Sequence, residues 1–147
     1  MPGPAPLGTV SGGVHRYPVR VYFEDTDLSG VAYHANYLRW MERARSDLLL
    51  FTAADQRAAW EAGAGAYAVA DLQIRFRAPA RLTDDLIVET RALGYKAATT
   101  TMAQRVLRAD TVLTEATVVA AFVSPDGRPL RQPQAWLESF RALFPPA

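Results

Sequence analysis

One short stretch of the chain holds most of the residues whose types and spacing suit catalysis. It reads EDTDLSGVAYHANY over residues 24–37 and contains two aspartates and one of the two histidines in the 147-residue chain. An aspartate is ionised near neutral pH, because its unperturbed pKa is ~3.9, and it can attack an activated acyl group or take a proton from water. Asp27 is therefore a candidate nucleophile or general base.

A helix is expected directly after this stretch and would begin near Ala35. Its apolar residues recur at three- and four-residue spacing, as in an amphipathic helix: Tyr37, Trp40, Met41, Ala44, Leu48 and Phe51. The first backbone N–H groups would be unpaired, at the positive end of the helix dipole. They could stabilise a carbonyl oxygen as it becomes an oxyanion, by ~3–4 kcal/mol per good donor. Gly30 would let the preceding loop turn sharply and approach a ligand.

Each of these residues also has a purely structural interpretation. Aspartates before a helix commonly cap it, and His34 suits a surface or capping position. Glu42 lies inside the expected helix, where Arg43 or Arg45 could pair with it. No serine sits in a G-x-S-x-G elbow, so a serine triad is weakly supported. The pattern alone leaves the stretch as either a helix cap or a catalytic loop.

Composition excludes several other kinds of site. The chain has no cysteine, which rules out disulfides, thiolate zinc sites and cysteine nucleophiles. Because His15 and His34 are the only histidines, we expect no metal site. The 16 basic residues nearly balance the 15 acidic ones, which argues against a nucleic-acid partner, since neutralising phosphates takes a local excess of cations.

The first residues of the chain are rich in proline and glycine and carry neither a basic region nor a long apolar run. Such a segment suits neither a signal peptide nor a membrane span. We therefore predict a disordered tail over residues 1–14, a single domain over residues 15–147, and a cytoplasmic protein without membrane insertion.

Strand signals fill most of the remaining chain. Alternating apolar and polar residues predict strands over residues 15–24 and 67–82, and further strand-like runs cover residues 85–93, 98–107 and 112–123. A final helix is expected over residues 133–144. One long helix followed by a run of strands favours an antiparallel α+β sheet over a doubly wound parallel one. The sheet would curl around the helix, and its uncovered part could be buried by another subunit.

Residues 19–49, VRVYFEDTDLSGVAYHANYLRWMERARSDLL, closely resemble the signature of the hotdog-fold acyl-CoA thioesterases. The likeness is to the group of 4-hydroxybenzoyl-CoA thioesterase and the Tol-Pal-associated, YbgC-like thioesterases. The matching elements are D-T-D with a following glycine, Y-H-A-N-Y entering the helix, and E-R-A-R within it. Residues 74–90 also look like the family's next two strands, so the resemblance covers roughly residues 19–123.

The resemblance implies a fold, an activity and roles for particular residues. The fold would be α+β, a hotdog fold in which a five-stranded antiparallel sheet wraps around a long central helix. The enzyme would hydrolyse an acyl-CoA to a free acid and CoA, without a cofactor. Asp27 would be the catalytic carboxylate, and the helix N-terminus at His34 would polarise the thioester carbonyl. Tyr33 and Asn36, beside these residues, would shape the acyl pocket together with Gly30.

Further expectations concern the binding of CoA and the assembly of subunits. Arg75 and Arg77 are candidates for binding the CoA phosphates, as is Arg81, although a solvated strand face explains them equally well. The family pairs sheets side by side, so the resemblance implies a homodimer or homotetramer with acyl-CoA at a subunit interface. The thioester suits such a site, because a thiolate leaves readily (cysteine-like pKa ~8.5) and needs little help from a general acid.

Three alternatives stay open at this stage. Glu42 could serve as the carboxylate in place of Asp27, as in hotdog enzymes that use a helix residue. A hotdog dehydratase is less well supported, because that family resembles a histidine followed by F-P-G, whereas His34 is followed by Ala35 and Asn36. A non-catalytic protein that binds acyl-CoA would need no carboxylate opposite the helix. The sequence does not fix the identity of the acyl group.

Overall fold

Six strands form one antiparallel sheet, in the order β1-β2-β4-β5-β6-β3, within residues 5–147, the part of the chain that the computed structural model describes. The strands are β1 (Thr9–Ser11), β2 (Val14–Arg20), β3 (Ala66–Phe76), β4 (Asp85–Tyr95), β5 (Thr99–Arg108) and β6 (Thr111–Val123). The helices are α1 (Ala35–Leu49), α2 (Gln56–Glu61) and α3 (Gln134–Leu143), and a 3-10 turn, η1 (Phe23–Asp25), precedes α1.

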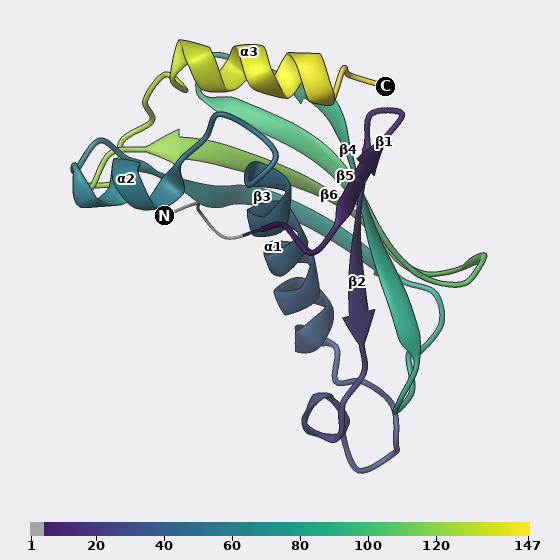
Figure 1. Cartoon of the computed structure of the whole chain (residues 1–147). Coiled ribbons are helices and arrows are strands. Elements are labelled where there is room, and N and C mark those ends of the chain that lie inside the picture. The colour runs from purple at the N-terminus through teal and green to yellow at the C-terminus, as the bar shows by residue number, and fades with distance from the viewer. Residues whose placement is uncertain (1–4) are drawn as a thin grey trace.

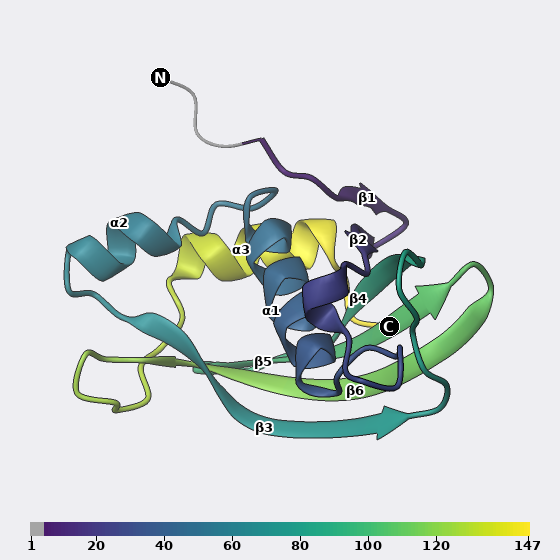
Figure 2. The ribbon, with the colours of Figure 1, turned by 90° about the horizontal axis from the view of Figure 1, so that it is seen from below.

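The long helix α1 lies across one face of the curved sheet, and α2 and α3 lie on the same side (Figures 1 and 2). Trp40 and Met41 of α1 are 2% and 0% exposed. They belong to a core that includes Val88 of β4, Val106 of β5 and Val118 of β6. Burial of one such side chain contributes about 1.5–3 kcal/mol. The apolar stripe expected from the sequence therefore fixes the helix on the sheet.

The strand β3 forms one edge of the sheet and pairs with β6 along most of its length. Three of its large apolar side chains are exposed, Val69 by 50%, Leu72 by 36% and Phe76 by 47%. Long, apolar and unpaired edges are templates for pairing with another chain. The face of the sheet opposite α1 carries no helix of residues 5–147 (Figure 2). The expected uncovered part of the sheet is thus this face together with the β3 edge.

The predicted antiparallel α+β architecture is confirmed, with six strands rather than five. The additional strand is β1, which is too short for a periodic pattern. Its pairing with β2 corrects the disordered tail predicted over residues 1–14, because Val10 lies opposite His15 in the ladder. Residues 1–4 lie outside the described part of the chain. The short helix α2 was also not expected; Asp55 caps it by accepting a hydrogen bond from the Ala58 N–H at 2.9 Å.

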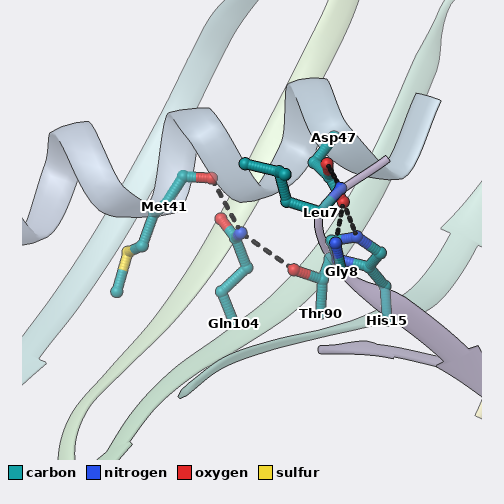
Figure 3. A network of polar contacts seen from close by, with 7 residues as sticks. All are labelled: Leu7, Gly8, His15, Met41, Asp47, Thr90 and Gln104. Atoms are coloured by element: carbon teal, nitrogen blue, oxygen red, sulfur yellow. Dashed lines mark hydrogen bonds and ion pairs between the residues drawn. The ribbon is translucent and has the colours of Figure 1, made fainter. Parts of the chain in front are cut away.

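A buried polar network attaches the N-terminal segment to α1 (Figure 3). The Asp47 carboxylate accepts the N–H of Leu7 at 2.7 Å, the N–H of Gly8 at 2.9 Å and the Nε2–H of His15 at 2.8 Å. Burial lowers the pKa of His15, although the hydrogen bond with Asp47 opposes the shift. The imidazole is therefore neutral, and Asp47 is balanced by three donors. A Cβ at Gly8 would lie 2.5 Å from the Arg16 carbonyl oxygen.

We predict that Gly8→Ala lowers the free energy of unfolding by about 1–3 kcal/mol, the usual cost of overpacking. The added methyl group has no room beside the Arg16 carbonyl, His15 and Asp47. Gly94→Ala is the control, because a Cβ there meets nothing within 4 Å. Urea denaturation followed by circular dichroism measures both variants. Equal stability of the two would show that the close packing at Gly8 is not needed.

Candidate active site

The loop between β2 and α1 is closed by its own backbone. Thr26 and Ala32 pair across it, and the Asp27 N–H donates to the Val31 carbonyl at 2.9 Å. The Gly30 N–H donates to the Asp27 carbonyl at 3.2 Å, which closes a tight turn. Gly30 has φ +82°, and a Cβ there would meet nothing within 4 Å. The glycine therefore serves the left-handed conformation of the turn.

Asp27 stands exposed at the tip of this turn with one carboxylate oxygen engaged. Its Oδ1 accepts the Ser29 N–H at 2.8 Å and the Ser29 hydroxyl at 2.5 Å. Its Oδ2 accepts no hydrogen bond from residues 5–147. The hydrogen bonds from the Ser29 hydroxyl and backbone hold the pKa of the Asp27 carboxyl below its usual value. The group is thus an anion with one oxygen fixed and the other free.

The N-terminus of α1 presents unpaired donors. His34 occupies the N-cap position, and its side chain makes no capping hydrogen bond. The N–H of Asn36 donates to Tyr33 at 2.9 Å and that of Tyr37 to His34 at 3.3 Å. The N–H groups of His34 and Ala35 have no acceptor among residues 5–147. Both are available to an external oxygen at the positive end of the helix dipole.

Asn36 and Tyr37 hold the loop and the helix in place. The Asn36 amide is buried and donates to the Asp25 carbonyl at 2.8 Å. The Tyr33 N–H donates to the same carbonyl at 2.8 Å. The Tyr37 hydroxyl accepts the N–H of Ala80 at 2.8 Å. Asn36 thus holds the loop against the start of the helix. A direct contact of its side chain with the acyl group stays a prediction.

An exposed aromatic surface adjoins the helix N-terminus. The His34 ring lies 4.3 Å from the Tyr33 ring and 6.3 Å from the Phe76 ring, measured between centroids. Tyr33 is 51% exposed. Phe76 ends β3, so this contact brings the edge strand to the loop. No functional motif in the sequence includes Phe76 or the hydroxyl of Ser29. For Ser29, the only signal is a serine two residues after an aspartate.

The predicted phosphate-binding arginines differ in their surroundings. Arg77 is engaged with Glu115, Nη2 to Oε2 at 2.9 Å. Arg75 lies on β3, opposite Glu115 in the ladder; it is exposed and has no carboxylate within ion-pair distance among the described residues. The backbone of Arg81 pairs with Val31 of the loop. Arg75 and Arg81 are therefore the freer cations, and their contact with CoA stays a prediction.

Glu42, the alternative carboxylate, lies on an exposed part of α1. Its Oε1 accepts the Ser46 hydroxyl at 2.9 Å. Glu42 borders two hollows. One is an open groove of about 510 Å³ between α1 and β3 that includes Leu38 and Leu72. The other is a cavity of about 160 Å³ between α1, α3 and the sheet. Glu42 is thus placed along a surface that leads away from the unpaired helix donors.

Two negative findings apply to residues 5–147. No three histidine, aspartate or glutamate side chains lie together in a way that could hold a metal ion. No helix is long and apolar enough to cross a membrane. The absence of a cofactor and a cytoplasmic location stay predictions.

A curved antiparallel sheet around one long helix, with a carboxylate loop at the start of that helix, defines a hotdog-type protein. Residues 21–144 match the family described as the thioesterase-like superfamily. The chain therefore belongs to the thioesterase-like superfamily, as the resemblance of residues 19–49 predicted.

Individual relatives support this membership. Over 111 residues the chain is 40% identical to the acyl-CoA thioester hydrolase YbgC of Escherichia coli O6:H1, which covers 75% of this chain and 82% of the relative. It is 43% identical over 107 residues to the acyl-CoA thioesterase YbgC of Haemophilus influenzae, covering 73% and 79%. A crystal structure of a probable thioesterase from Bartonella henselae has a TM-score of 0.77 and 34% identity, covering 82% of this chain and 99% of that chain.

We predict that Ser29→Ala moves the acidic limb of the pH–kcat/KM profile to higher pH. The Ser29 hydroxyl stabilises the ionised form of Asp27, so its removal raises the pKa at which the carboxylate forms. Ser124→Ala is a matched control, since the Ser124 hydroxyl donates to Asp126 at the same two-residue spacing, in the opposite order, far along the chain. Superimposable profiles for Ser29→Ala and wild type would mean that Asp27 does not govern that limb.

Proposed function

We propose that this acyl-CoA thioesterase hydrolyses its substrate with the Asp27 carboxylate and the N-terminal backbone of α1. One observation carries the proposal: a single short loop presents a carboxylate with a free oxygen and leads directly into a helix start with two unpaired N–H groups. Acyl transfer needs a nucleophile or base and a site for the developing oxyanion. The loop and the helix start supply one each.

In the proposed reaction, the thioester carbonyl oxygen accepts hydrogen bonds from the N–H groups of His34 and Ala35. The Oδ2 of Asp27 takes a proton from a water molecule, whose oxygen attacks the carbonyl carbon. The tetrahedral intermediate then expels CoA as a thiolate, which receives the proton from Asp27, and the free acid leaves. Direct attack by Asp27 would instead give a mixed anhydride that water hydrolyses; both routes use the same two groups.

Glu42 fits this chemistry less well than Asp27. It lies seven residues after Ala35 along α1, about 10 Å at the rise of an α-helix. A carboxylate at that distance from the N–H donors would not reach a carbonyl bound to them. The geometry therefore favours Asp27 as the reacting carboxylate.

We predict that Asp27→Asn lowers kcat by ~10²–10⁴-fold, the usual contribution of a positioned base. Asparagine keeps the shape and the hydrogen bonds with Ser29 but cannot accept a proton. Glu42→Gln should lower kcat far less. Release of free thiol from acyl-CoA measures both, with circular dichroism to verify folding. The assignment fails if Asp27→Asn keeps its turnover, and an acyl-CoA-binding protein is indicated if wild type binds substrate without releasing thiol.

The surroundings of these groups suggest how the rest of the substrate binds. We place the carbonyl end of the acyl group beside Gly30, Tyr33 and Asn36, on the aromatic side of the helix start. The CoA phosphates would meet Arg75, with Arg77 held partly by Glu115. Charge-assisted contacts of this kind orient a phosphate without fixing the acyl group.

The edge strand β3 is the proposed interface of a homodimer. It offers eleven residues of unpaired edge, apolar side chains on its exposed surface, and direct contact with the active site through Phe76 and His34. Pairing two copies along this edge would satisfy its free backbone groups and extend the sheet. A dimer would also cover the groove between α1 and β3, and two dimers could form a tetramer.

We predict that Leu72→Asp gives monomers in sedimentation velocity at micromolar concentration. A carboxylate on the β3 edge cannot be buried between two subunits without a partner charge. Leu50→Asp serves as the control, because Leu50 is similarly exposed, at 44% against 36% for Leu72, but lies after α1. A wild-type monomer, or a dimer that survives Leu72→Asp, would exclude this interface.

A further inference from the structure

The cavity beneath α3 has walls that suit an aliphatic guest. Its apolar surface comes from α1, from the C-terminal part of the chain and from the sheet, and includes Leu48, Leu49, Met102, Ala120, Phe140 and Phe144. An apolar cavity of about 150 Å³ accommodates a benzene-sized guest. The volume here, about 160 Å³, is therefore sufficient for roughly six carbons.

Three hydroxyl groups in the walls are already paired with the protein. The Tyr67 hydroxyl donates to Gln132 at 2.7 Å and the Tyr95 hydroxyl to the Phe144 carbonyl at 2.7 Å. Burial raises the pKa of both tyrosines. Thr100 also donates to Gln132, at 2.8 Å. These three hydroxyls are therefore not available as donors to a polar acyl group.

The charged residues that border the cavity form hydrogen bonds within the protein. Arg45 donates to the Gln104 Oε1 at 2.8 Å. The same Gln104 side chain donates to the Met41 carbonyl and the Thr90 hydroxyl, both at 3.0 Å (Figure 3). The Glu42 carboxylate accepts the Ser46 hydroxyl. The Arg45 guanidinium and the Glu42 carboxylate thus each have a partner within the protein.

The cavity adjoins the groove that runs along α1. Both hollows are bordered by Glu42, Arg45 and Val69. The groove extends back to Leu72 of β3 and to Leu38 of α1, which lies one turn after the helix donors at His34 and Ala35. An acyl chain attached to a carbonyl at those donors would follow the apolar side of this groove, past Leu38 and Leu72, to the cavity.

The length of this path selects a length of acyl chain. About 10 Å of helix separates Ala35 from Glu42, where the cavity begins. An extended aliphatic chain advances about 1.3 Å per carbon, from C–C bonds of ~1.5 Å. About eight carbons reach the mouth, and the cavity holds several more.

We propose that the acyl-CoA is a linear aliphatic one of about ten to fourteen carbons, whose far end lies in the cavity beneath α3. The proposal rests on the thioesterase chemistry of Asp27 described above and adds the class of acyl group to it. Tyr67, Tyr95, Phe140 and Phe144 then determine specificity without touching the reacting atoms.

The test compares kcat/KM for butyryl-, hexanoyl-, decanoyl-, dodecanoyl- and benzoyl-CoA, below micellar concentrations, in wild type and Val69→Phe. Val69 borders both the cavity and the groove, is 50% exposed, and lies opposite Ala120 of the cavity wall, so a phenyl ring there would narrow the entrance to the cavity. We expect wild type to prefer dodecanoyl-CoA. Val69→Phe should lose at least about tenfold on dodecanoyl-CoA and stay within about twofold on hexanoyl-CoA.

Ala70→Phe is the matched control on the same strand. Ala70 is exposed and does not border the cavity, so every substrate should keep its wild-type value within about twofold. If Val69→Phe fails to assemble, Ala120→Leu fills the same cavity from β6 and should show the same selective loss.

The outcomes separate this proposal from the one on which it rests. Three results would overturn the acyl-chain site while leaving the thioesterase chemistry intact. They are equal losses of kcat/KM on hexanoyl- and dodecanoyl-CoA, no loss on either, and a wild-type preference for benzoyl-CoA. No thiol release from any acyl-CoA by wild type would instead overturn the proposed function.

Discussion

The candidate active site depends on one constraint, which is that α1 must begin at the loop with its first N–H groups unpaired. Most helices satisfy such a donor with an N-cap side chain, at a gain of about 1 kcal/mol. Here the N-cap is His34, whose side chain makes no such bond. Packing of Trp40 and Met41 against the sheet stabilises the helix instead, so its N-terminus is free for another task.

Hydrogen bonds from buried side chains hold this helix at both ends. At the start, Asn36 binds the loop carbonyl of Asp25 and Tyr37 binds Ala80. Toward the end, the Asp47 carboxylate accepts hydrogen bonds from His15 and from the N-terminal backbone (Figure 3). A buried donor or acceptor left without its partner costs about 1–3 kcal/mol, so each contact resists a shift of the helix along the sheet. The direction of the N–H groups is thereby fixed before any substrate binds.

The sequence predicted those parts of the fold that have a local signal. The periodicity of α1 and the alternation of the longer strands depend on neighbours within a few residues, and these elements appear where expected. The strand β1 has no such signal, since its three residues are too few to show an alternation. The segment before it is attached by Asp47, 40 residues away from Leu7. The contact of Phe76 with His34 likewise joins residues far apart in the chain, and only the path of the sheet brings them together.

In the loop before α1, too, the sequence predicted the residue types but not their hydrogen bonds. Its aspartates and Gly30 were recognisable from residue type, and the start of the helix followed from periodicity. The freedom of one Asp27 oxygen and the pairing of the other with Ser29 depend on the fold of the turn, which no pattern of single residues specifies. The same holds for Arg77, which pairs with Glu115 although the register of β3 against β6 places Arg75 opposite Glu115.

The two ends of α1 have different surroundings. The proposed reaction and the choice of acyl chain therefore depend on different parts of the helix. At the N-terminus the groups are exposed, polar and free to exchange protons with water. Toward the C-terminus the wall hydroxyls are paired and the surface is apolar. Because some 10 Å of rigid helix separates them, a change in the cavity would alter which acyl chain fits without moving the Asp27 loop. Rate and specificity would then depend on different residues of one helix, and substitutions at the two ends should have independent effects.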